Sequence, residues 1–178
     1  NGKKSDFRAS HVHVVGAGVM GGDIAAWCVL KGLTVTLQDQ SPERIAPAIK
    51  RAARLFRKKL KVSRLVTAAM DRLIPDIEGF GLKRADVVIE AIFENLEAKQ
   101  KLFKHIESQV RDNTLLCTNT SSIPLEEISA ALTNPARLAG LHFFNPVDKM
   151  QLIEIVHSHQ TDSEIIKQAS AFAIQISR

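Results

Sequence analysis

Short hydrophobic runs alternate with longer amphipathic segments along this chain, which predicts strands and helices in turn. Strands are expected at 11–15, 33–37, 85–89, 115–118, 138–141 and 151–156, with a further short strand within 74–79. Helices are expected at 23–31, 63–73, 96–110 and 125–132, from Pro42 through the basic segment after it, and at the end of the chain. Strands that alternate with helices favour a doubly wound, mostly parallel sheet with helices on both faces.

Capping residues support several of these helix boundaries. Gly32 is expected to end the helix at 23–31, and Ser41 with Pro42 to begin the next one. Asn95 begins the helix at 96–110. The spacing Thr161-x-x-Glu164 predicts a capping box at the start of the last helix.

A glycine-rich turn follows the first strand. Gly16, Gly18 and Gly21 form a G-x-G-x-x-G pattern between strand 11–15 and a helix, and Asp39 follows the next strand. The glycine pattern alone is a weak signal, but strand, glycine turn, helix, strand and acidic residue together predict a Rossmann-type dinucleotide site. Gly16 permits the tight turn, Gly18 lets the backbone approach a pyrophosphate, and Gly21 allows close helix–strand packing. Asp39 would bind the ribose hydroxyls and repel a 2′-phosphate, which favours NAD over NADP.

Near the C-terminus, a histidine ends one hydrophobic run and a carboxylate lies inside the next one. His142 follows the strand expected at 138–141, and Glu154 interrupts the strand expected at 151–156. A carboxylate buried among apolar neighbours needs a partner, and His142 is the obvious one. The pair could act as a general base and the group that orients it. The alternative is a core histidine and a solvent-facing glutamate.

Composition bounds the class of protein. With 178 residues, of which 45% are hydrophobic and 24% charged, the chain suits one domain, or one domain and a fragment of another. No apolar run approaches the ~20 residues of a membrane span. Cys28 and Cys117 lie in apolar segments without metal-type spacing, so we expect core thiols in a reducing compartment and no metal.

The net charge of +5 is concentrated in one segment. Eight basic residues occur there without an acidic residue between them: Lys50, Arg51, Arg54, Arg57, Lys58, Lys59, Lys61 and Arg64. The segment could be a solvated helix face or could attract phosphate groups. Nucleic acid is not expected as a partner, because the segment has one aromatic residue and no nucleic-acid-binding motif.

Ligands of doubly wound sheets lie beyond the carboxyl ends of the strands. The segments at these predicted ends should therefore meet in one crevice: 16–21, Asp39, 91–95, 119–122 and 142–145.

The segments GAGVMG, VVIEAIFEN, TNTSSIP and HFFNPVDKMQLIEIV together resemble the NAD-binding domain of the L-3-hydroxyacyl-CoA dehydrogenase family. The resemblance extends from about residue 11 to the end of the chain. The amino-acid sequence at 74–95 and 119–124 looks closest to the dehydrogenase part of the multifunctional fatty-acid oxidation alpha subunit of bacteria.

The resemblance implies roles for individual residues. His142 would be the catalytic base and Glu154 its partner, with the Ser121 hydroxyl on the substrate oxygen and Asn145 near the nicotinamide. The implied cofactor contacts are Gly16, Gly18, Val19, Met20, Gly21, Asp39, Gln40, Ala91, Ile92, Glu94, Lys99, Asn119, Ser121 and Asn145. The implied substrate contacts are Ser121, His142, Lys58, Lys59 and Lys61, the lysines toward the CoA phosphates. Asp23 and Trp27 are departures from the small or polar residues common after the glycine turn.

The resemblance also implies what surrounds this domain. Residues 1–10 are expected to be a linker or a remnant of a longer chain, and residues 11–178 the NAD-binding domain. A helical C-terminal domain would complete the acyl-CoA site, and a homodimer or a thiolase-containing complex is a possible assembly. We expect cytoplasmic β-oxidation in a bacterial source, with NAD as cofactor and an L-3-hydroxyacyl-CoA as substrate. The alternatives are a non-catalytic NAD-binding module and a dehydrogenase of free hydroxy acids.

Overall fold

A seven-stranded sheet forms the centre of the computed structural model, which describes residues 4–149 and 152–177. The strands are β1 (His11–Val15), β2 (Thr34–Gln38), β3 (Leu73–Pro75), β4 (Val87–Glu90), β5 (Leu115–Thr118), β6 (Leu138–Phe143) and β7 (Ile153–Val156). Their order across the sheet is β3-β2-β1-β4-β5-β6-β7. Neighbouring strands are parallel, except that β7 runs antiparallel to β6. The doubly wound, mostly parallel sheet predicted from the sequence is confirmed.

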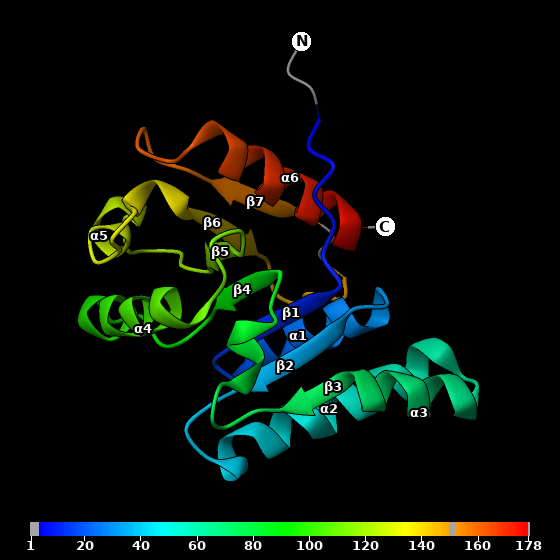
Figure 1. Cartoon of the computed structure of the whole chain (residues 1–178). Helices are drawn as coiled ribbons and strands as arrows, with labels where there is room; N and C mark the ends of the chain where they lie inside the picture. The colour runs from blue at the N-terminus through cyan, green and yellow to red at the C-terminus, as the bar shows by residue number, and fades with distance from the viewer. Residues whose placement is uncertain (1–3, 150–151, 178) are drawn as a thin grey trace.

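Helices cover both faces of this sheet (Figure 1). The helices are α1 (Val19–Leu30), α2 (Pro42–Leu60), α3 (Ser63–Arg72), α4 (Leu96–Gln109), α5 (Leu125–Ser129) and α6 (Ser163–Ser177), with short 3₁₀ turns η1 (Phe80–Lys83) and η2 (Pro135–Arg137). One apolar core lies between the sheet and α1, α2, α3 and α6. A second core lies on the other face, beneath η1, α4 and α5. The central strands β1, β4 and β5 are buried because both of their faces are covered, whereas the edge strands β3 and β7 are partly exposed.

A tryptophan links two helices of the first core, α1 and α6. The indole Nε1 of Trp27 donates a hydrogen bond of 2.7 Å to the carbonyl of Ile176, which ties α1 to α6. The N-terminal segment joins the same unit, since Ala9 is buried and exchanges two backbone hydrogen bonds with the side chain of Gln175. Part of the segment expected to be a linker therefore packs on α6.

Several boundaries differ from the sequence-based expectations. Helix α1 begins at Val19 rather than at residue 23, so Gly21 lies inside it. Strand β6 continues through Phe143, which places His142 within the strand rather than after it. Strand β7 begins at Ile153; residue 151, where it was expected to start, lies outside the described residues.

The capping box predicted at Thr161 is wrong. The N–H of Glu164 donates to Oδ1 of Asp162 at 2.8 Å, so Asp162 caps α6. The Thr161 hydroxyl instead accepts the N–H of Ser158 at 2.9 Å in the preceding turn. A carboxylate is a stronger acceptor than a hydroxyl and adds charge at the positive end of the helix.

Candidate functional site

The glycine turn joins β1 to α1 with almost no free space around two of its glycines. Gly16 has φ +105°, and a Cβ built on it would lie 2.5 Å from the carbonyl oxygen of Ala91. A Cβ on Gly21 would lie 1.8 Å from the Gly16 carbonyl oxygen. A Cβ on Gly18 would meet no atom within 4 Å, so this backbone faces open space at the first turn of α1. The first N–H groups of a helix have no intrahelical partner and bind anions well. This loop therefore presents a cradle for a phosphate group.

Asp39 lies directly beside the cradle. Its Oδ2 accepts the N–H of Ala17 at 2.9 Å, and its Oδ1 accepts the N–H of Gln40 at 2.7 Å. The end of β2 is tied to the turn a second time, because the Gly16 N–H donates to the Gln38 carbonyl at 2.8 Å. The carboxylate is therefore held in one orientation at the mouth of the turn, and its remaining lone pairs can accept hydroxyl groups.

One cation of the basic segment points inward to this turn. Arg51 of α2 donates from Nη2 to the Gly18 carbonyl at 3.2 Å, and its Nε lies 3.6 Å from Oδ1 of Asp23. Burial raises the pKa of the Asp23 carboxyl above its ordinary value, and the nearby Asp148 also raises it against the opposing charge of Arg51. The sequence does not reveal this pair, because Arg51 is one of eight similar basic residues and no spacing rule links it to Asp23. Lys58, Lys59 and Lys61 are exposed on or just after the end of α2.

The turn after β4 forms the wall next to Gly16. Its backbone is fixed by Glu90, whose Oε2 accepts the Ile92 N–H at 2.8 Å. Lys99 of α4 pairs with the same carboxylate at 2.5 Å and is fully buried. Because its ammonium has no exposed surface, a direct contact of Lys99 with a ligand would require a rearrangement of the wall. Ala91 and Ile92 themselves are partly exposed along it.

Glu94 joins the turn after β4 to the turn after β5. Its Oε2 accepts the hydroxyls of Thr120 and Ser122, both at 2.7 Å. Partial burial raises the pKa of the Glu94 carboxyl, but the hydrogen bonds from Ser122, Thr120 and Lys99 outweigh it and lower the pKa below its ordinary value. Ser121, between the two donors, is exposed. The two hydrogen bonds from Thr120 and Ser122 to Glu94, called the Glu94 clamp below, therefore fix the residues on either side of Ser121.

His142 and Glu154 lie directly opposite each other in the β6–β7 pairing. Directly opposed residues share one face of a sheet, and the His142 Nδ1 lies 3.6 Å from the Glu154 Oε2. This distance is within ion-pair range but too long for a hydrogen bond. Asn119 supports the same strand, since its Oδ1 accepts the Phe143 N–H at 3.1 Å. The imidazole ring also contacts the ring of Phe144, with centroids 4.6 Å apart.

The expectation that Glu154 is buried is wrong for this chain. The side chain of Glu154 is 54% exposed and that of His142 is 27% exposed. The reason is the alternation along β7: Ile153 and Ile155 pack on the first core, so the residue between them faces away from it. The two residues nevertheless meet on one face of the sheet, as predicted.

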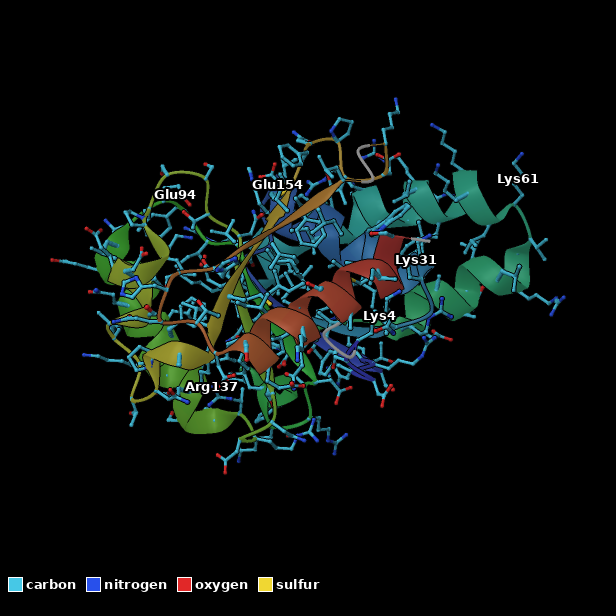
Figure 2. All side chains as sticks on the ribbon, turned by 90° about the horizontal axis from the view of Figure 1, so that it is seen from above. Lys4, Lys31, Lys61, Glu94, Arg137 and Glu154 are labelled. Atoms are coloured by element: carbon cyan, nitrogen blue, oxygen red, sulfur yellow. The ribbon has the colours of Figure 1, made fainter. Side chains whose placement is uncertain are left out.

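The candidate residues lie along one edge of the molecule. Figure 2 shows Glu94 and Glu154 at the upper edge, whereas Arg137, which precedes β6, lies at the opposite edge. Asn145, in the loop after β6, is exposed, as are Val19, the first residue of α1, and Gln40, just after β2. The carboxyl ends of the parallel strands therefore carry the site, as such sheets require.

The cysteines lie in the core, away from the candidate site. Cys28 and Cys117 are fully buried, and burial raises the pKa of both thiols to about 12, as expected for core residues. Within residues 4–149 and 152–177, no group of three His, Cys, Asp or Glu side chains could hold a metal ion. None of the helices in those ranges is both long and apolar enough to cross a membrane.

The fold and the edge residues define a dinucleotide-binding α/β domain. Residues 11–178 match the family model for the NAD-binding domain of 3-hydroxyacyl-CoA dehydrogenases. The chain belongs to this family, whose members are NAD-dependent oxidoreductases, and the resemblance inferred from its motifs is confirmed. The glycine turn fits NAD, because it leaves the space over Gly18 open and places the Asp39 carboxylate beside it.

Solved structures support the same assignment. The chain is similar to 3-hydroxybutyryl-CoA dehydrogenase from Escherichia coli, with 35% identity, a TM-score of 0.91, and coverage of 97% of this chain and 37% of that one. It is also similar to (S)-3-hydroxybutyryl-CoA dehydrogenase from Ralstonia eutropha, with 32% identity, a TM-score of 0.89, and coverage of 96% of this chain and 62% of that one. The dehydrogenase part of a multifunctional enzyme from C. elegans is similar as well, with 27% identity, a TM-score of 0.87, and coverage of 97% of this chain and 40% of that one. The chain thus spans between 37% and 62% of the length of these relatives.

Proposed function

We propose that this domain serves an NAD-dependent oxidation of an L-3-hydroxyacyl-CoA to the 3-oxoacyl-CoA in fatty-acid β-oxidation. The observation that carries the proposal is the His142–Glu154 pair on β6 and β7, whose Glu154 lies at the same edge of the molecule as Glu94 (Figure 2). The named substrates of the similar E. coli and R. eutropha enzymes are 3-hydroxybutyryl-CoA compounds, which supports an acyl-CoA substrate.

In this mechanism His142 removes the proton of the 3-hydroxyl group. Its Nδ1 faces Glu154, so the Nε2 lone pair is the available acceptor. As the proton arrives, the imidazolium gains a carboxylate 3.6 Å away that stabilises its charge. NAD, when bound, supplies the acceptor for the hydride that leaves C3. General base catalysis of this kind contributes typically ~10²–10⁴-fold.

The other residues of the edge would bind and orient. The Ser121 hydroxyl would donate to the substrate oxygen, and the Glu94 clamp on Thr120 and Ser122 keeps it in place. Asn145 and Asn119 would lie near the nicotinamide. The exposed Lys58, Lys59 and Lys61 would attract the CoA phosphates by raising the local concentration of anions.

The full site is expected to need more chain than these 178 residues. Half-exposed Glu154 and exposed Ser121 leave the substrate side of the edge uncovered here, and the relatives are longer than this chain. A helical C-terminal domain would cover this side and complete the acyl-CoA pocket. We further propose that the protein acts in the cytoplasm and that this domain belongs to a multifunctional chain. The full protein would form a homodimer or a complex that contains a thiolase.

The decisive experiment compares His142→Gln with the unchanged full-length protein. We expect NADH formation from L-3-hydroxybutyryl-CoA to fall about 10²–10⁴-fold, with NAD affinity unchanged. Glu154→Gln should give a smaller loss, because it leaves the base in place. Full activity of His142→Gln would contradict the proposal and favour a non-catalytic NAD-binding module. Activity on the free hydroxy acid but not its CoA ester would contradict the substrate class.

A further inference from the structure

A buried ion pair lies behind the wall of the site, and the proposed reaction does not use it. Glu90 is the last residue of β4 and Lys99 is the fourth residue of α4; both side chains are 0% exposed. Oε2 of Glu90 accepts from the Lys99 ammonium at 2.5 Å, and Oε1 accepts the Thr118 hydroxyl at the same distance. The carboxylate therefore joins the ends of β4 and β5 to α4.

The same pair controls the backbone and the carboxylate that face the site. Glu90 accepts the Ile92 N–H, while the Lys99 ammonium donates to the Ile92 carbonyl at 3.3 Å. The third neighbour of the ammonium is Oε1 of Glu94, at 3.4 Å. The turn at 91–94 is thus held at both its start and its end by one carboxylate–ammonium pair.

This turn is a contact surface of the glycine loop. The Ala91 carbonyl oxygen lies 2.5 Å from where a Cβ of Gly16 would be, and the Ala91 N–H donates to the Val15 carbonyl at 2.8 Å. In the sheet order, β4 stands between β1, which carries the phosphate cradle, and β5 and β6, which carry Ser121 and His142. Moving the turn at 91–94 would therefore shift the wall between the two halves of the site.

Stability alone is a weak reason for such a pair. Burying two charges costs desolvation energy, and apolar side chains of similar volume often stabilise a fold equally well or better. Here the pair instead fixes polar backbone groups that a hydrophobic pair would leave without partners. The geometry therefore points to a role in the shape of the site.

We propose that Glu90 is a positioning residue of the NAD site. It acts through Lys99, and together they hold the turn at 91–94 against the glycine loop and place Glu94 under Thr120 and Ser122. The role of Glu90 in NAD binding requires only that the domain binds NAD, as its family does. Any effect of Glu90 on the Ser121 hydroxyl, which lies between Thr120 and Ser122, rests on the proposed function.

The test is a double-mutant cycle of NAD affinity, measured by calorimetry on folded protein well below its unfolding temperature. We expect Glu90→Gln to weaken NAD binding about tenfold, or about 1.4 kcal/mol. Lys99→Met should weaken it by a similar factor. The double variant should bind no more weakly than Lys99→Met alone, because residues that act as a unit are not additive. Wild-type affinity in Glu90→Gln, or additive losses in the double variant, would overturn the proposal.

Thr118→Val is the matched control. It removes another hydrogen bond of the same buried carboxylate, the one to Glu90 Oε1, and leaves the hydrogen bonds of Glu90 Oε2 to Ile92 and Lys99 in place. We expect lower thermal stability with unchanged NAD affinity, whereas a loss as large as that of Glu90→Gln would assign the effect to general loosening and overturn the proposal. If Glu90→Gln does not fold, Glu90→Asp keeps the charge but shortens its reach to Lys99 and should weaken NAD binding in the same way; unchanged affinity would overturn the proposal. A failure of acyl-CoA turnover would not alter these affinities, so the two proposals can fail separately.

Discussion

The carbonyl oxygen of Gly16 occupies the space where a side chain of Gly21 would begin. The gap of 1.8 Å between this oxygen and a built Cβ is far below any van der Waals contact. The first turn of α1 therefore packs directly on the glycine turn that follows β1. Gly18, two residues from Gly16, has open space instead.

The two glycines should fail in different ways. Gly21→Ala forces the first turn of α1 away from Gly16, so both the unfolding temperature and NAD affinity should fall. Gly18→Ala fits the free fold, so the unfolding temperature should stay near that of wild type, while its methyl group occupies the space of the pyrophosphate and weakens NAD binding at least tenfold. Calorimetry and thermal denaturation measure both quantities. Wild-type NAD affinity in Gly18→Ala would show that the dinucleotide does not approach the loop here.

Asp39 should set the preference for NAD over NADP. Hydrogen bonds to charged groups contribute about 1.5–3 kcal/mol each, so Asp39→Ala should weaken NADH binding by at least about tenfold. NADPH binding should improve or stay unchanged, because a 2′-phosphate no longer meets a like charge. The ratio of the two dissociation constants, from fluorescence titration, is the measurement. An unchanged ratio would place the ribose elsewhere.

Arg51 should support the cradle, unlike its neighbours on α2. Arg51→Gln removes the bond to the Gly18 carbonyl and the ion pair with Asp23, so we expect several-fold weaker NAD binding. Arg54→Gln changes the same net charge on the same helix at an exposed position and is the control. Equal losses in the two variants would reduce the effect to overall charge and contradict a specific role of Arg51.

Two histidines should make the fold sensitive to mild acid. Burial lowers the pKa of His13 and of His11 below the ordinary 6.5, outweighing the nearby carboxylates of Asp76 and Asp86. His13 is held neutral between Thr36 Oγ1 at 2.7 Å and Gln38 Oε1 at 2.9 Å. Below pH 6.5 the unfolded chain therefore binds protons that the native state does not, so the free energy of unfolding falls as the pH falls.

Urea denaturation between about pH 7.5 and pH 5 measures this slope. His13→Gln should lower the free energy of unfolding at neutral pH but flatten its decline in acid. His159→Gln, at an exposed position, should keep the wild-type slope. Glu94 and Asp86, whose carboxyl pKa values are lowered, add a further loss only at more acidic pH. An unchanged slope in both His13→Gln and His11→Gln would contradict the assignment.

Much of the site was predictable because its signals are local. The glycine spacing, the strand before it and Asp39 after the next strand all lie within residues 11–39, and the alternation of strands and helices indicates that they meet at one edge. The pairing of His142 with Glu154 also followed from two hydrophobic runs joined by a short loop. These features depend on the conformational limits of single residues and on periodicity, which the order of residues contains directly.

Tertiary packing decided which charges meet. Arg51 reaches Gly18 only because α2 lies against α1, and no spacing rule separates it from the other basic residues of its helix. Glu90, Thr118 and Lys99 come together from three elements in the second core, so their contacts depend on how α4 packs on the sheet. Glu154 is exposed because the register and face of β7 put its neighbours into the core. Desolvation and pairing of charges depend on three-dimensional distance, which sequence separation does not determine.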